Sequence, residues 1–215
     1  AGALLASTPT PFIVFFGSWY YQDYKNQSNF EPLCKEAFVE TIEHTAQAKS
    51  LAFLPDSFIS PPEYSKSEIG SWSSFILNQS LLEFIERPVT KESGLKGKAE
   101  FERVTIKGKR ILRSNGTNER TTFIYEPIDK ITAQYIVRSE PLAVEHGSES
   151  GLGGAKIEIY RRDDNKLISR AKYYWSNKLF RSCPMETRGG MFVYHFIVES
   201  LNVKNPEGPR RVAPQ

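Results

Sequence analysis

Ile131-Thr-Ala-Gln-Tyr-Ile-Val-Arg-Ser139 is the stretch that decides the fold, because apolar and polar side chains alternate along it. The odd positions up to Val137 are apolar, and Thr132, Gln134 and Arg138 are polar, with one exception to the alternation. A period of two is typical of a β-strand that buries one face and exposes the other. The stretch therefore predicts a half-buried antiparallel sheet.

The same period extends over most of the second half of the chain. It predicts further strands at 98–106, 109–114, 120–126, 156–161 and 166–175. Asn115-Gly116 and Asp163-Asp164-Asn165 accept a positive φ, so they predict hairpin turns. The run from Met191 to Val198 is rich in aromatic and β-branched residues, which favours a last strand over a helix.

Two amphipathic helices are expected before these strands. The first covers 32–50, where apolar side chains recur every four residues at Cys34, Phe38, Ile42 and Ala46. The second begins near Trp72 and ends before Pro88, after an ordered loop over 54–71. The predicted fold class is α+β, with two N-terminal helices packed on a curved antiparallel β-meander of six or seven strands.

Composition divides the chain into three parts. A length of 215 residues with 40% hydrophobic side chains fits one globular domain, so 23–204 is predicted to be a single α+β domain. Residues 1–22 form an apolar N-terminal segment, which is either the end of a membrane anchor or a buried first strand. Residues 205–215 contain several prolines and are expected to be a loosely ordered tail.

No charged residue precedes Asp23. An uncharged run of this length approaches that of a membrane-spanning helix, and Trp19, Tyr20 and Tyr21 at its end suit a membrane interface. Prolines inside the run shorten its apolar core, which suits a buried strand or the remnant of a signal peptide. The sequence leaves these alternatives open, and in the first of them residues 1–21 contact a membrane.

The two cysteines, Cys34 and Cys183, have no zinc-like or dithiol spacing. They either form a disulfide with each other or remain as two buried thiols. Three N-x-S/T sequons at Asn26, Asn78 and Asn115 accompany them. Together these features favour an extracytoplasmic location, either periplasmic or secreted.

The charge pattern argues against a nucleic-acid partner. The net charge is only +3, and the basic stretch from Lys96 to Arg113 lies in a predicted strand region that sends neighbouring side chains to opposite faces.

The three histidines are widely separated, and none lies at ligand spacing from a cysteine. We therefore expect no metal and no cofactor.

A glycine-rich loop over 145–154 brings together His146, Ser148 and Glu149, which makes it the best candidate for hydrolase chemistry. It matches neither a nucleophile elbow nor a phosphate-binding loop, because no G-x-S-x-G and no G-x-x-x-x-G-K occurs there. We expect a flexible loop, with a functional loop, either binding or catalytic, as the alternative.

The leading functional hypothesis is a non-catalytic, extracytoplasmic and membrane-associated subunit that binds other protein subunits through its sheet edges. The order of elements is also similar to that of cone-shaped α+β folds, which often hold apolar ligands or act as assembly subunits. The alternative is therefore a carrier of a small apolar ligand inside the curved sheet, lined by Phe123, Tyr125, Tyr135 and Tyr173.

Overall fold

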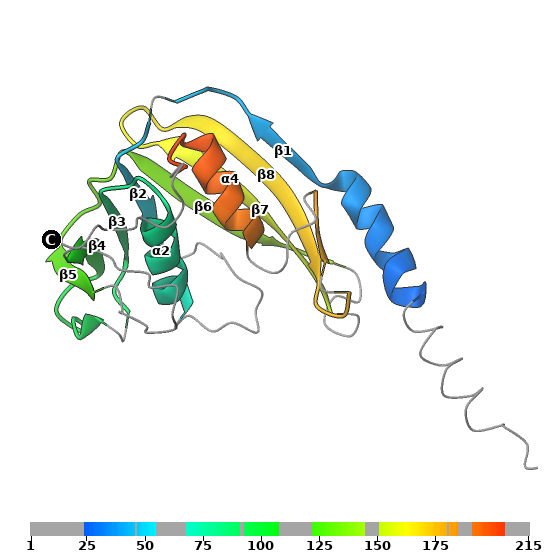
Figure 1. The fold of residues 1–215 in the computed structure, drawn as a ribbon, viewed down its shortest axis with the longest axis horizontal. Coiled ribbons are helices and arrows are strands. Elements are labelled where there is room, and N and C mark those ends of the chain that lie inside the picture. The colour runs from blue at the N-terminus through cyan, green and yellow to red at the C-terminus, as the bar shows by residue number, and fades with distance from the viewer. Residues whose placement is uncertain are drawn as a thin grey trace, which may run out of the picture.

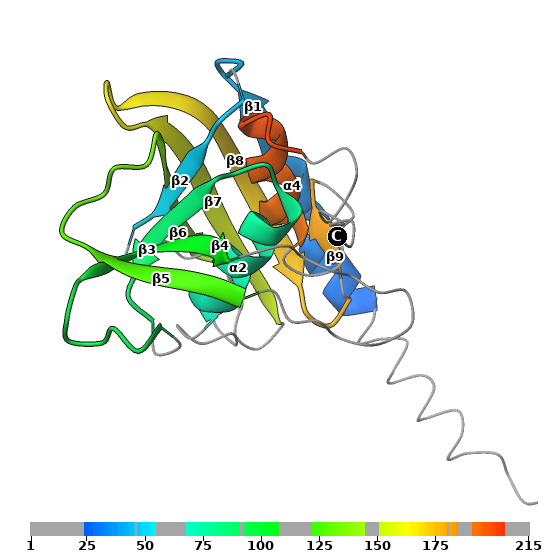
Figure 2. The same cartoon turned by 60° about the vertical axis from the view of Figure 1, so that its left-hand side comes forward.

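The computed structural model describes residues 24–45, 47–54, 68–90, 93–107, 122–144, 151–179, 181–184 and 191–204. Within these residues the chain forms a strongly curved nine-stranded sheet with helices packed on it (Figures 1 and 2). The strands are β1 (Phe38–Thr41), β2 (Ser50–Phe53), β3 (Phe84–Pro88), β4 (Phe101–Lys107), β5 (Thr122–Ile128), β6 (Tyr135–Leu142), β7 (Leu152–Arg161), β8 (Lys166–Ser176) and β9 (Arg181–Cys183). The helices are α2 (Glu68–Gln79), α4 (Met191–Ser200) and an N-terminal helix over residues 24–36.

Two antiparallel meanders make up most of the sheet. Its strand order is β1-β8-β7-β6-β2-β3-β4-β5, and β9 pairs with β8 off this path. One meander is β3-β4-β5 and the other is β6-β7-β8, each with antiparallel pairing between consecutive strands. β2 joins them by pairing in parallel with both β3 and β6.

The sheet is therefore broadly of the expected α+β class, but it is mixed, and the prediction of a purely antiparallel meander is wrong at β2. All four residues of β2 are buried. A parallel strand with both faces covered has no solvated face, and Leu51, Ala52 and Phe53 are apolar in succession, so β2 lacks the apolar-polar alternation that reveals a half-buried strand. For this reason the sequence pattern did not predict β2.

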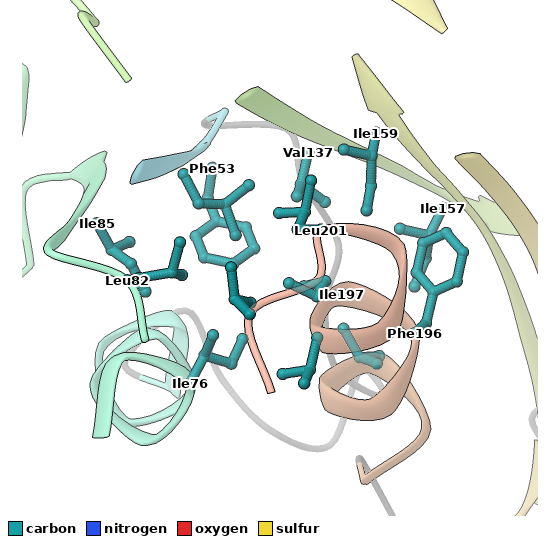
Figure 3. Packing of buried hydrophobic residues seen from close by; sticks show 14 of the residues in the cluster. Phe53, Ile76, Leu82, Ile85, Val137, Ile157, Ile159, Phe196, Ile197 and Leu201 are labelled. Carbon is teal, nitrogen blue, oxygen red and sulfur yellow. The ribbon is translucent and has the colours of Figure 1, made fainter. Parts of the chain in front are cut away.

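One face of the sheet, here called the inner face, is covered by α2 and α4. Figure 3 shows side chains from both helices and from the strands meeting in one apolar cluster. Ile76 and Leu77 of α2 and Phe196 and Ile197 of α4 are buried there, at 0–2% exposure. The opposite face, here called the outer face, carries most of the charged side chains of β6, β7 and β8.

The prediction of a last strand over Met191 to Val198 is wrong, because this segment is α4. Its buried positions include Phe192, Val193, Phe196 and Ile197, a spacing that follows the helical repeat. The aromatic and β-branched residues suit a strand in isolation, but here they fill the space above the inner face. Tertiary packing outweighs the local preference.

The two N-terminal helices are also displaced from their predicted positions. Helical structure covers 24–36 rather than 32–50, and the rest of the predicted helix contains β1 and the first residue of β2. α2 ends at Gln79, and Phe84–Pro88 is strand β3 rather than the end of a helix. Ile85 to Pro88 pair with β4, and this cross-strand pairing is invisible to a local pattern.

The predicted strands that the structure describes lie close to β4, β5, β6, β7 and β8. The predicted turn at Asp163-Asp164-Asn165 joins β7 to β8, and Asn165 has a φ of 51°. The predicted strand 109–114 and the turn at Asn115-Gly116 lie outside the described residues. So do residues 1–23 and the tail from 205 onward.

Candidate interaction edge

β1 forms one edge of the sheet. It pairs antiparallel with β8, with Phe38 opposite Lys172 and Thr41 opposite Ser169. Among the described residues no strand pairs with its other side. An unpaired strand edge is a template on which another strand can add by backbone hydrogen bonds.

The edge strand exposes apolar side chains. All four residues of β1 are exposed, and Phe38 and Val39 keep 37% and 44% of their surface in solvent. Ile42, just beyond the strand, keeps 46%. Three neighbouring apolar side chains on an open edge are unusual unless another surface covers them.

The backbone geometry determines which groups a partner would meet. The amide of Ile42 donates to the carbonyl of Ile168, so the groups of Ile42 point toward β8. Orientation alternates along an antiparallel strand, and the backbone carbonyl of Glu40 accordingly accepts a hydrogen bond from the Ser169 hydroxyl at 2.8 Å. The N–H and C=O groups of Val39 and Thr41 therefore point away from the sheet.

The other end of the sheet offers a poorer edge. β5 pairs only with β4 along the described sheet, and it contains Pro127 opposite Glu102. Proline has no N–H to donate, and proline on an edge strand is a common way to block the addition of another strand. β1 contains no proline.

A disulfide holds the open edge in place. Cys34 lies near the end of the helix over 24–36, shortly before β1, and it is bonded to Cys183 at the end of β9. β1 and β9 pair with successive parts of β8, at Ser169–Lys172 and Tyr174–Ser176. The disulfide thus links the helix that precedes β1 to β9, and β1 and β9 are the two short strands on the same side of β8. The sequence had left this pairing open.

A small apolar cluster surrounds the disulfide on the outer face. Phe30, Leu152, Tyr174 and Cys183 are buried in it, and it fixes the helix over 24–36 against the end of the sheet. Figure 2 shows this helix beside β9. Cys34 packs against this cluster as a partly buried side chain, but the predicted buried stripe is wrong, because Phe38 and Ile42 lie beyond the helix and are exposed.

Glu36 connects the same helix to β8. Its carboxylate accepts hydrogen bonds from Lys172 Nζ at 2.6 Å and from the Tyr174 hydroxyl at 3.3 Å. The hydrogen bond and charge of Lys172 lower the pKa of Glu36, and the hydrogen bond to Glu36 raises the pKa of Lys172. Both groups are solvent-accessible, so this ion pair contributes little to the stability of the fold.

The four residues expected to line an apolar ligand all lie on the inner side of the sheet. Phe123 and Tyr125 on β5 are separated from Tyr135 on β6 by β4, β3 and β2, or about 19 Å of sheet. Tyr173 on β8 lies opposite Ala155 on β7, and Ala155 lies opposite Pro141 on β6. Pro141 is six residues from Tyr135, or about 20 Å along β6. All four contact the main apolar cluster, Tyr173 as a buried member and the other three as partly buried neighbours.

Tyr173 itself is part of that core. It is 4% exposed and stacks on Phe192 of α4 with ring centroids 4.8 Å apart. Burial raises the pKa of its hydroxyl strongly. These contacts assign Tyr173 to the packing of α4 against β8.

The glycine-rich loop is shorter than predicted, because β7 begins at Leu152. Gly153 and Gly154 are strand residues that face the rings of Trp175 and Tyr174 on β8. A Cβ atom on Gly153 would overlap the indole of Trp175, and one on Gly154 would lie 2.5 Å from Tyr174 Cδ1. These two glycines therefore make room for aromatic rings.

Several predicted site residues lie outside the described residues. They are the loop candidates His146, Ser148 and Glu149, and the interface candidates Trp19, Tyr20 and Tyr21. Within the described ranges, no helix combines the length and apolar character needed to cross a membrane.

Two of the sequons lie in helices. Asn26 is 9% exposed in the helix over 24–36, and Asn78 is in α2. Glycan acceptors are surface asparagines, so the buried Asn26 adds little to the argument for an extracytoplasmic location. Asn115 lies outside the described residues, and the disulfide is what remains to favour that location weakly.

A group of charged side chains lies under α2. The guanidinium of Arg87 donates to Glu102 Oε1 at 2.8 Å and also to the Ser73 hydroxyl, and Thr90 lies beside both. Arg87, Glu102 and Ser73 are fully buried. This cluster joins α2 to the β3–β4 hairpin through buried hydrogen bonds.

Sequence reasoning missed the edge strand because it placed residues 38–41 inside a helix. Phe-Val-Glu-Thr-Ile over 38–42 combines an aromatic residue with three β-branched ones, which prefer strands. That local composition was the available signal. The four-residue spacing from Cys34 to Ala46 outweighed it.

Comparison of the chain with protein-family models, with curated proteins and with solved structures found no match.

Proposed function

We propose that this protein is a non-catalytic interaction subunit that takes up an extended segment of another protein along β1. The observation that carries the proposal is the open edge, where two outward-facing peptide units at Val39 and Thr41 lie among exposed apolar side chains. Strand addition uses backbone hydrogen bonds for affinity and side-chain contacts for specificity. β1 offers both.

The disulfide supports the second part of the proposal, which is an extracytoplasmic location. Disulfides persist in oxidising compartments, and this one fastens the edge that the partner would use. We further propose that the uncharged residues 1–22 associate with a membrane. In that arrangement the helix over 24–36 links the membrane segment to the interaction edge.

In-cell photo-cross-linking tests the proposal. A photoreactive amino acid replaces Phe38 on the edge strand, and in a second variant it replaces Asp163 in the exposed β7–β8 turn as the control. We expect a discrete protein adduct from position 38 and none from position 163. The additional substitution Val39→Pro should remove the adduct, because it deletes an outward-pointing N–H group that β8 does not use.

Two results would contradict the proposal. One is equal cross-linking from both positions, and the other is an adduct from position 38 that survives Val39→Pro. The thermal midpoint of the Val39→Pro protein is measured in parallel, and we expect it to stay close to that of the wild type because the fold remains intact.

A further inference from the structure

A row of alternating charges crosses the outer face and ends at the open edge. Arg138 on β6 lies opposite Glu158 on β7, Glu158 lies opposite Arg170 on β8, and Arg170 lies opposite Glu40 on β1. These four residues are here called the charge row. Opposite charges in facing positions of neighbouring strands stabilise a sheet, and like charges destabilise it.

Glu40 is the last member of the charge row. Arg170 Nε lies 2.5 Å from Glu40 Oε2 on the β8 side, and the Glu40 side chain still keeps 48% of its surface in solvent. A strand added to β1 would place one of its side chains directly opposite Glu40, with Cβ atoms about 5 Å apart. A positive charge continues the alternation there, whereas a negative charge would face a carboxylate.

The two positions before Glu40 on β1 are apolar. Phe38 shares the outer face with Glu40, and Val39 projects to the inner face beside the buried Ala171. This inference rests on the proposed strand addition. We infer that the segment that pairs with β1 carries a Lys or Arg opposite Glu40. Next to that residue it carries two apolar residues, which lie opposite Val39 and Phe38. The partner is thus an extended, basic-apolar segment of a different protein.

A second copy of the chain fits this edge poorly. The segment 36–43 contains three glutamates and no basic residue. Antiparallel self-pairing of β1 would place Glu40 opposite its own counterpart, or opposite Phe38 or Ile42 of the other copy, according to the register. None of these registers supplies a cation.

Selection from a displayed library of random nine-residue peptides tests the inference, with the full chain as target at low ionic strength. The three targets are the wild type, Glu40→Lys and the matched control Glu140→Lys. Glu140 lies on the same outer face but on β6, with β7 and β8 between it and β1. We expect Lys or Arg beside two apolar residues from the wild type and the control, and Asp or Glu at that position from Glu40→Lys.

Binding of one selected peptide and of its Lys→Glu counterpart then measures the effect. We expect the basic peptide to bind roughly 2- to 10-fold more tightly to the wild type, with the order reversed on Glu40→Lys. Peptides that are lost on Val39→Pro but show no charge preference would overturn this inference and leave the proposed function standing. If no selected peptide depends on Val39, the proposed use of the edge is itself wrong.

Discussion

Arg87 and Glu102 face each other across the β3–β4 hairpin, with Nε 2.8 Å from Oε1 and no solvent exposure of either side chain. The next pair along the hairpin, Glu86 and Arg103, has the opposite order of charges and lies on the opposite face. Two reversed ion pairs on successive positions therefore fasten the hairpin on both sides.

The Arg87–Glu102 pair predicts a pronounced asymmetry between single and double substitutions. Arg87→Met leaves the Glu102 carboxylate buried without its cation, so the free energy of unfolding should fall by about 3–5 kcal/mol. Within the described structure, Glu102 Oε2 has no hydrogen-bond partner, so Arg87→Met combined with Glu102→Leu should recover most of this loss.

Urea denaturation of the two single variants and the double variant measures these differences. Arg162→Ala, which breaks an ion pair on the exposed β7–β8 turn, is the control and should change stability by less than about 1 kcal/mol. A double variant as unstable as Arg87→Met would show that the pair itself stabilises the fold.

Glu86 predicts a loss of stability in acid. Burial alone would raise the pKa of its carboxyl, but hydrogen bonds from Arg103 and from the backbone N–H groups of Ala133 and Thr132 lower it below 4.5 overall. A lowered pKa in the folded state means that this stabilisation is complete above pH 4.5 and is lost as the pH falls through the folded-state value.

Unfolding free energies measured between pH 7 and pH 3 should therefore decline less steeply for Glu86→Gln than for the wild type. Glu83→Gln removes one charge from an exposed position just before β3 and is the control. Parallel pH profiles for the wild type and Glu86→Gln would contradict this assignment.

The disulfide predicts both a global and a local effect. It joins residues 149 positions apart, and closing so long a loop restricts the unfolded chain by about 5 kcal/mol in the loop-entropy description. Cys34→Ser with Cys183→Ser should lower the free energy of unfolding by up to that amount. Amide exchange should accelerate most in residues 24–41, because the bond fastens that segment to β9. Uniform acceleration over the sheet would argue against this local role.

Gly153 predicts a steric effect that depends on a single ring. Gly153→Ala would place a methyl group against the indole of Trp175, so we expect a destabilisation of about 1–3 kcal/mol. The same substitution in a Trp175→Leu background should cost less, and thermal melts of the four proteins in this double-mutant cycle give the coupling energy. A coupling energy near zero would mean that the glycine serves another purpose.

The sequence by itself determined the parts of the sheet where one face is buried and the other is solvated. Alternation located β6 and β8, and the turn residues Asp163 to Asn165 located the hairpin between β7 and β8. These signals are local, because a half-buried strand displays its period in its own residues.

The tertiary structure alone decided the remaining elements. β2 is buried on both faces and shows no period, and α4 is helical because its aromatic residues fill the inner face rather than because they prefer a helix. β1 is a strand because β8 pairs with it. The interaction edge thus depends on a long-range pairing, for which residues 38–41 alone contain only a weak preference.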